Sequence, residues 1–206
     1  TAHLKIIPLF LGWDDPGVSI SASLQLGSAI AIILYFKHDL NSIIKPLLSI
    51  SRHTKQYKYE GYRLAKYIFI ASLPICIVGL AIKIFWLNYS DSFLRSLSSI
   101  AIVSILMALL LLLSDIYGTK EKGIYNININ NIIFIGISQA FALIPGVSRS
   151  GITLTSALLV GLNRNSAARL SFLVGIPAIT ISGLVELLTL LRFLTLSEIV
   201  PLIIGI

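Results

Sequence analysis

The sequence predicts an all-α fold: a polytopic bundle of membrane helices with re-entrant helix–loop–helix segments and an inverted repeat. Composition is the first reason, because 56% of the 206 residues are hydrophobic and only 12% are charged, whereas soluble domains carry about 25% charged residues. A bilayer tolerates such an apolar surface when the backbone polar groups are paired within helices. The other reasons are four long apolar runs and two shorter ones.

The long runs lack charged residues and predict spanning helices, which need about 20 apolar residues. They are Pro16–Phe36, Tyr67–Ile82 with an extension past Lys83 to Leu87, Ser96–Ser114, and Leu170–Val185 continuing to Leu191. The chain opens at Thr1 without a methionine and closes within an apolar run. We therefore expect a single integral-membrane domain over residues 1–206, truncated at both ends.

The two shorter runs, Ile132–Ile144 and Ile152–Leu162, flank a Pro-Gly pair and two serines. Apolar stretches of about 10–14 residues are more often re-entrant or buried than spanning. The pattern therefore predicts a helix, a loop and a second helix. A loop at membrane depth is tolerated only where protein or a water-filled cavity surrounds it, so this loop is a candidate site.

Basic residues predict the orientation, because Lys- and Arg-rich loops stay in the cytoplasm. The segment Lys37–Lys66, expected to be a loop, carries seven Lys and Arg residues against two acidic ones. It could also bind anionic phospholipid or nucleic acid, but retention on the inner side explains it without a further assumption, and we expect no nucleic-acid partner. Asp14 and Asp15 fit the outer side.

The predicted path contains two similar units of opposite orientation. The turn Gly12–Gly17 lies outside and leads into an inward helix, whereas the turn Asn163–Arg169 lies inside and leads into an outward helix. Inverted repeats with a site near the bilayer midplane are common in transporter folds. The sequence therefore predicts an inverted repeat.

Arg149 is the most informative polar residue, because it lies between two apolar helices, far from any loop that would let it reach water. An arginine at membrane depth is costly and marks a functional site. Its neighbours suit a phosphate: hydroxyl donors, glycines that allow close approach, and a helix expected to begin near Gly151 with free N–H groups. These neighbours are Gly146, Ser148, Ser150, Gly151 and Thr153. The alternative is a structural loop whose arginine pairs with a carboxylate elsewhere.

The other polar residues give weaker indications of a functional site. His3 is the second catalytic candidate, and Gln25 either faces a polar cavity or bonds a neighbouring helix. We expect His38 and His53 to be solvated, and Lys83, Glu186 and Arg192 to reach the membrane interface. The sequence contains no Walker loop, no His/Cys metal spacing and no dinucleotide fingerprint.

The segment Ala142-Leu-Ile-Pro-Gly-Val-Ser-Arg-Ser-Gly-Ile-Thr153, followed by Gly161–Pro177, closely resembles the undecaprenyl-diphosphatase family, also called bacitracin-resistance proteins. Thr1-Ala-His3 and Gln25-Leu-Gly27 resemble two further motifs of that family. The resemblance implies a multi-pass enzyme of the bacterial inner membrane. Such an enzyme hydrolyses undecaprenyl diphosphate to undecaprenyl phosphate, recycles the lipid carrier for peptidoglycan synthesis and confers bacitracin resistance.

Residue by residue, the resemblance implies that Arg149 binds the diphosphate with Ser148 and Thr153, and that His3 is the nucleophile or general base. It also implies a divalent cation, Mg2+ or Ca2+, with ligands upstream of Thr1, so we expect the chain alone to be inactive. The polyprenyl tail would lie between helices, among membrane lipids. A polyprenyl-phosphate carrier that uses the same anion site without hydrolysis is the alternative, and His3 favours the enzyme.

Overall fold

The computed structural model describes residues 6–8, 10–13, 17–47, 55–86, 89 and 92–190. These residues form seven named α-helices and three short 3-10 turns, which confirms the all-α prediction. The helices are α2 (Gly17–Tyr35), α3 (Lys37–Leu47), α4 (Lys55–Phe85), α5 (Leu97–Tyr117), α6 (Ile129–Ala140), α7 (Arg149–Leu159) and α8 (Arg164–Leu190). The 3-10 turns are η2 (Phe93–Arg95), η3 (Ile124–Asn126) and η4 (Phe141–Leu143).

Three helical segments among the described residues are long and apolar enough to cross a membrane: Tyr59–Phe85, Leu97–Tyr117 and Arg164–Thr189. They coincide with three of the predicted spans. The remaining predicted span coincides with α2, in which Leu24–Tyr35 forms a shorter apolar helix. Length and apolar composition together make this chain a membrane protein.

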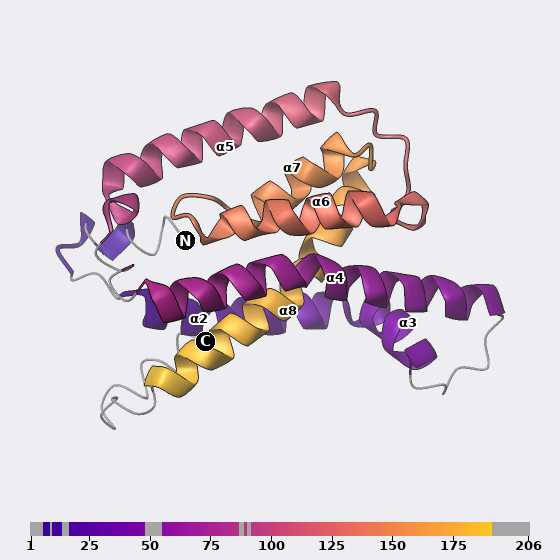
Figure 1. The fold of residues 1–206 in the computed structure, drawn as a ribbon, viewed down its shortest axis with the longest axis horizontal. Helices are drawn as coiled ribbons and strands as arrows, with labels where there is room; N and C mark the ends of the chain where they lie inside the picture. Colours follow the sequence, from indigo (N-terminus) through magenta and orange to yellow (C-terminus); the bar gives the residue numbers. More distant parts are fainter. Residues whose placement is uncertain are drawn as a thin grey trace.

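The helices are arranged around the short pair α6 and α7 (Figure 1). Helix α5 covers one side of this pair and α4 covers the other, while α8 crosses the bundle obliquely. Helix α2 packs along α8, and α7 packs between α5 and α8. The buried apolar core is formed mainly by α4, α6, α7 and α8.

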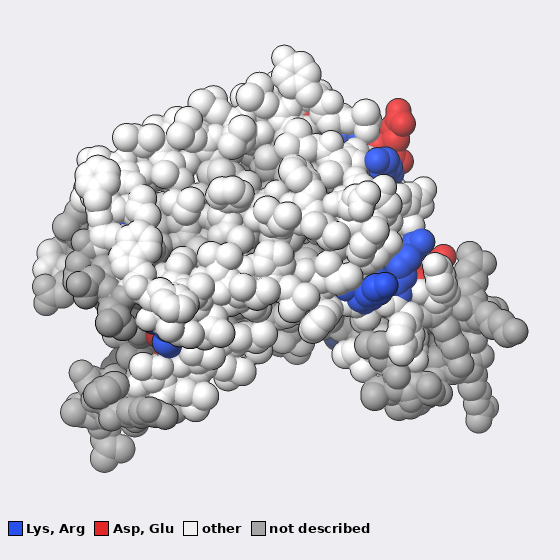
Figure 2. Space-filling view, in the orientation of Figure 1, with Lys and Arg blue, Asp and Glu red and all other residues white. Residues whose placement is uncertain are grey.

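Charged side chains gather at the two ends of the bundle, and the surface between them is free of charge in this view (Figure 2). Lysine and arginine gather at one end, which we call the basic end; it includes Lys120 and Arg164, which pair with Asp115, and Lys122, which donates to Val160 O. An uncharged belt between two polar ends is the surface that a bilayer requires.

The re-entrant prediction is confirmed as a helix–loop–helix, since α6 and α7 are both too short to span a bilayer. Helix α7 begins at Arg149, two residues before the predicted start, because the Ser148 side chain caps it by accepting from Gly151 N at 3.2 Å. Helix α6 packs so closely on α4 that a Cβ on Gly136 would lie 2.8 Å from Ala71 Cα. The hairpin is therefore held against α4.

Two predictions of loop structure were wrong. Much of Lys37–Lys66 is helical, because Leu40 and Ile43 of α3 pack inward while Lys37, Asn41 and Lys45 are exposed. Asn163–Arg169 is the start of α8 rather than a turn, because the Asn163 side chain caps the helix by accepting from Ser166 N at 2.8 Å. The inverted repeat stays a prediction, since Gly12–Gly17 is only partly described.

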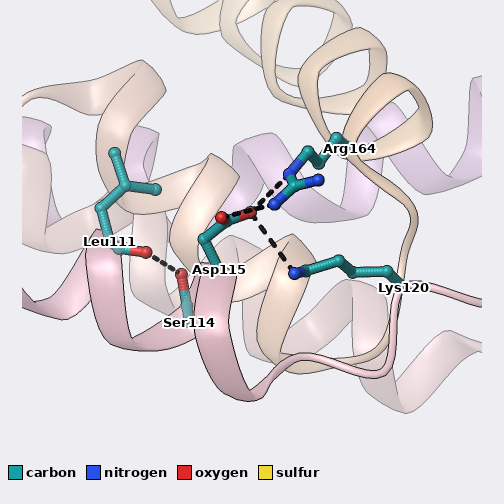
Figure 3. Close-up of polar contacts among 5 residues, drawn as sticks. All are labelled: Leu111, Ser114, Asp115, Lys120 and Arg164. Carbon is teal, nitrogen blue, oxygen red and sulfur yellow. Dashed lines mark hydrogen bonds and ion pairs between the residues drawn. The ribbon is translucent and has the colours of Figure 1, made fainter.

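Ion pairs fasten the helices to one another at the basic end (Figure 3). Arg164 at the start of α8 donates to both carboxylate oxygens of Asp115 in α5, each at 2.7 Å, and Lys120 lies 3.8 Å from the same carboxylate. Lys122 donates to Val160 O at the end of α7, at 2.8 Å. The ion pairs thus join α8 to α5, and the Lys122 bond joins the end of α7 to the connection that precedes α6.

The opposite end has its own contacts. Lys83 of α4 pairs with Glu186 of α8 at 2.7 Å, and the interfacial position of both residues stays a prediction. The Tyr89 hydroxyl donates to Leu143 O in η4, and burial raises the pKa of that hydroxyl while the nearby Arg95 partly opposes the rise. Tyr89 therefore ties the hairpin loop to the connection between α4 and α5.

Candidate functional site

The guanidinium of Arg149 lies inside the helix bundle, between α2 and α8. Nη1 donates to Gly175 O of α8 at 3.4 Å, and Nη2 donates to Gln25 Oε1 of α2 at 3.3 Å. Gln25 and Gly175 each lie near the middle of their helices. Arg149, the first residue of the re-entrant helix α7, therefore places its positive charge about halfway along α2 and α8.

Within the described residues, no contact of Arg149 compensates its charge. Both acceptors are neutral and both hydrogen bonds are long. No ion pair joins Arg149 to a carboxylate within the described part of the chain. An inward-facing arginine with only neutral partners can stabilise an added anion strongly, because the surrounding dielectric is low. No described residue provides the carboxylate partner of the alternative interpretation.

A cavity of about 530 Å3 lies beside Arg149. It is lined by Leu24, Gln25, Ser28, Ile32, Ser148, Arg149, Ser150, Ser171, Phe172, Gly175 and Ile179. The polar side chains come from α2, α7 and α8, and apolar side chains share the wall with them. A mixed lining of this kind suits a ligand with a charged head and a hydrocarbon tail.

Ser148 and Ser150 flank Arg149 and are both exposed. Their hydroxyl oxygens lie 3.4 Å apart. The Ser148 oxygen accepts from Gly151 N, so its own hydrogen remains able to donate to a ligand. The first N–H groups of α7 add further donors, because a helix start leaves them without partners inside the helix. The structure therefore brings together three of the predicted residues as neighbouring donors.

Thr153 lies behind the cavity wall rather than on it. Its side chain is fully buried, and its hydroxyl bonds Arg149 O at 2.9 Å and Ser171 Oγ at 2.7 Å. Ser171 in turn donates to Ser150 O at 3.0 Å and lines the cavity. This network joins the first turn of α7 to α8. Direct contact of Thr153 with a phosphate stays a prediction.

The two predicted glycines differ in position. Gly151 lies in the first turn of α7, where its N–H completes the Ser148 cap. Gly146 lies in the loop with a φ of +94°, and a Cβ there would lie 2.7 Å from Ile100 O of α5. The absent side chain of Gly146 therefore makes room for α5.

His3 lies outside the described residues, as do Asp14, Asp15, His53 and Arg192. His38 is exposed on α3, as expected. The described residues contain no group of three His, Cys, Asp or Glu side chains that could hold a metal ion.

Sequence reasoning did not single out Ser28, Ser171, Phe172 or Gly175 as site residues, although all four line the cavity. The spacing of Ser28 and Gly175 in the sequence could have indicated these two residues. Ser28 follows Gln25 by three residues, and Gly175 follows Ser171 by four, so each pair lies on one helix face. Which face meets Arg149 depends on the packing of α2 against α8, and this packing cannot be derived from one sequence.

Replacing Thr153 with valine, which keeps the side-chain shape, is expected to destabilise the protein by about 0.5–1.5 kcal/mol, because it removes the buried bond between Thr153 and Ser171 and leaves Ser171 bonded to Ser150 O. Phosphate release should also fall, since the network positions the turn that carries Arg149. Thermal unfolding of the purified full-length protein measures the first effect. Thr189→Val is the matched control, because among the described residues Thr189 Oγ1 bonds Val185 O of its own helix and nothing else. An unchanged unfolding midpoint for Thr153→Val would contradict the positioning role.

The fold and the site define an all-α membrane protein with an arginine-containing cavity among its helices. The chain belongs to the family described as bacitracin resistance protein BacA, whose family model matches residues 1–206. This match confirms the family resemblance that the loop motif indicated.

Curated relatives are similar over the whole chain. A protein named undecaprenyl-diphosphatase from Prochlorococcus marinus (strain NATL2A) is 59% identical over 206 residues, which cover 100% of this chain and 74% of the relative. A protein of the same name from Prochlorococcus marinus (strain MIT 9303) is 49% identical, with 100% and 70% covered. Another from Synechococcus sp. (strain CC9902) is 48% identical over 207 residues, with 100% and 73% covered.

Proposed function

We propose that this chain is a membrane phosphatase that converts undecaprenyl diphosphate to undecaprenyl phosphate and thereby confers bacitracin resistance. Its family and the name of its relatives support this activity. The observation that carries the assignment of the site is the guanidinium of Arg149, which faces a cavity and, among the described residues, contacts neutral acceptors alone.

Arg149 is the group that holds the diphosphate. A guanidinium presents a planar set of donors that matches two phosphate oxygens at once. The hydroxyls of Ser148 and Ser150 and the start of α7 donate to the remaining oxygens. Gln25 holds the guanidinium from the opposite wall, through the bond between Nη2 and Oε1 at 3.3 Å. The phosphate is thus bound between the re-entrant helix and α2.

Apolar side chains of the same cavity accommodate the lipid part of the substrate. Leu24, Ile32, Phe172 and Ile179 share the cavity wall with the polar residues. The first isoprene units of a polyprenyl diphosphate therefore meet apolar surface directly beside the phosphate groups. The rest of the tail lies between helices, among the membrane lipids.

His3 is the proposed nucleophile or general base, carried over from the family motif that Thr1-Ala-His3 resembles. A divalent cation, Mg2+ or Ca2+, is the proposed cofactor, because attack on a polyanion is helped by charge neutralisation. The described residues offer no suitable ligand cluster for it. The family resemblance supports ligands upstream of Thr1.

The chain is proposed to form one multi-pass domain over residues 1–206 in the bacterial inner membrane, with the basic end in the cytoplasm. Basic residues are retained on the cytoplasmic side of such membranes. Recycling of the lipid carrier for peptidoglycan synthesis is the role that this location and substrate support.

Phosphate release from undecaprenyl diphosphate by the purified full-length protein tests the activity. The wild-type protein should release phosphate, chelation of divalent cations should stop the release, and added Mg2+ or Ca2+ should restore it. His3→Ala should lower the rate by about 100-fold, in the range for loss of an acid–base or nucleophilic group. His38→Ala is the control, because His38 is exposed on α3, and it should keep the wild-type rate.

Binding of the lipid without any phosphate release by the wild-type protein would support a polyprenyl-phosphate carrier instead. A full rate for His3→Ala would remove His3 from the mechanism but leave the Arg149 site intact.

A further inference from the structure

A second cavity, of about 360 Å3, lies between α3, α4 and α8. Its lining is apolar except for Ser72 and Cys76. Leu40 and Ile43 of α3 close its end nearest the basic end, and Pro177 of α8 lies in its wall. We call this space the apolar groove. Its volume lies within the range of about 300–1,000 Å3 that is typical of ligand sites.

The apolar groove is separate from the Arg149 cavity, because α8 stands between them. Helix α8 contributes Leu173, Ile176, Pro177 and Ile181 to the groove, but Ser171, Phe172, Gly175 and Ile179 to the cavity. At 3.6 residues per turn these two sets lie on opposite faces of the helix. A ligand in the groove therefore does not reach Arg149 across α8.

The mouth of the groove opens toward hydrocarbon. Phe69 and Leu73 of α4 and Ile181 of α8 line it, and their side chains are 65%, 40% and 51% exposed. All three lie within helices long and apolar enough to span a membrane. Exposed apolar side chains at this depth face lipid tails, so the groove is accessible to an acyl chain from the bilayer.

Along α4, the rim of the groove becomes polar toward the basic end. Tyr62 and Lys66 precede Phe69 and Leu73 at intervals of three and four residues, so all four follow one helix face. Tyr62 is 57% exposed and Lys66 is also exposed. Tyrosine and lysine are the residues that stand at the headgroup level of membranes. Lys66 forms no ion pair within the described part of the chain.

Helix α3 has the form of a helix that lies at the membrane interface. Its apolar side faces the groove through Leu40 and Ile43, whereas Asn41 and Lys45 are exposed on its polar side. Asp39 pairs with Arg169, which fastens α3 to the start of α8. The groove therefore ends at the level where α3 meets the lipid headgroups.

We propose that the apolar groove binds an acyl chain of an anionic phospholipid, with the lipid phosphate held by Lys66 beside Tyr62. Charge complementarity selects an anionic headgroup, because the cation at the rim has no ion-pair partner among the described residues. Because the mouth of the groove opens toward lipid tails, we expect the ligand to be a lipid of the surrounding bilayer. This inference rests on the membrane position of the helices and not on the proposed phosphatase activity.

Native mass spectrometry of the full-length protein in mild detergent tests the site, with phosphatidylglycerol and phosphatidylcholine of identical acyl chains as probes. The wild-type protein should retain phosphatidylglycerol preferentially. Lys66→Glu should lower that retention by about tenfold, since it reverses one interfacial charge. Lys45→Glu is the matched control on the water-facing side of α3, and it should change retention little. Ala65→Phe, which fills the groove, should lower the retention of both lipids.

Equal retention of the two lipids by the wild-type protein would overturn the proposal. Equal losses of phosphatidylglycerol retention in Lys66→Glu and Lys45→Glu would also overturn the proposal, because such losses indicate general charge attraction rather than a specific site. Displacement of phosphatidylglycerol by polyprenyl phosphate, one for one and unaffected by Arg149→Ala, would assign the groove to the polyprenyl lipid instead. The thermal unfolding midpoint of each variant identifies a folding defect, and Lys66→Glu tests the site without altering the core.

Discussion

Replacing Arg149 with alanine will lower phosphate release from undecaprenyl diphosphate by about 100-fold or more, as removal of a single preorganised donor does in other active sites. The reason is the position of the guanidinium, which contacts the neutral oxygens of Gln25 and Gly175 and faces the cavity. Among the described residues, the variant loses the only cation that lines this cavity, while both helices that contact it keep their remaining packing. Phosphate release by the full-length protein measures the effect.

Two lysine variants separate the charge of Arg149 from its geometry. Arg149→Lys keeps a cation but loses the planar pair of donors, so its rate should lie between those of the wild-type protein and Arg149→Ala. Arg164→Lys is the matched control, because Arg164 makes a bidentate pair with Asp115 at the basic end. That control should keep the wild-type rate, since exposed ion pairs contribute little to stability. An Arg149→Ala protein with an unimpaired rate would end the assignment of Arg149 to the diphosphate.

Arg149 could be predicted from sequence because the cost of a charge at membrane depth is independent of tertiary detail. The same reasoning predicts the re-entrant hairpin, since a helix too short to span must return or be buried. The partners of Arg149 are different. The sequence allows two roles for Gln25, and the structure combines them, because Gln25 lines the cavity and bonds the guanidinium from a neighbouring helix.

The role of Thr153 shows where sequence reasoning stops. A hydroxyl close to an arginine predicts a phosphate ligand, but the direction of a helical side chain depends on the register of that helix against its neighbour. Thr153 turns toward Ser171 of α8, and this contact exists only after the two helices have packed. Helix α3 was missed for a related reason. The apolar residues of α3 are few and lie among charged ones, so the sequence alone does not reveal their helical spacing. The spacing becomes clear once α4 and α8 provide the surface against which these residues pack.

The second large effect is expected at Gly146, where alanine should destabilise the protein by about 2 kcal/mol or more. Two independent costs add. The φ of Gly146 is +94°, a conformation that L side chains rarely adopt. A Cβ there would also lie 2.7 Å from Ile100 O and 3.1 Å from Val103 Cβ, so α5 would have to move away from the loop.

Movement of α5 matters for activity because the loop delivers Ser148 and Arg149 to the cavity. Ser104 of α5 donates to Gly146 O at 3.2 Å, so a displaced loop also loses this bond. We expect Gly146→Ala to lower both the thermal unfolding midpoint and the rate of phosphate release. Gly123→Ala is the control, since Gly123 has a negative φ of −79° and an added Cβ meets nothing within 4 Å. A stable Gly146→Ala protein that releases no phosphate would point to a direct role of Gly146 in ligand approach. Loss of both properties would show that the close contact with α5 is what holds the arginine in place.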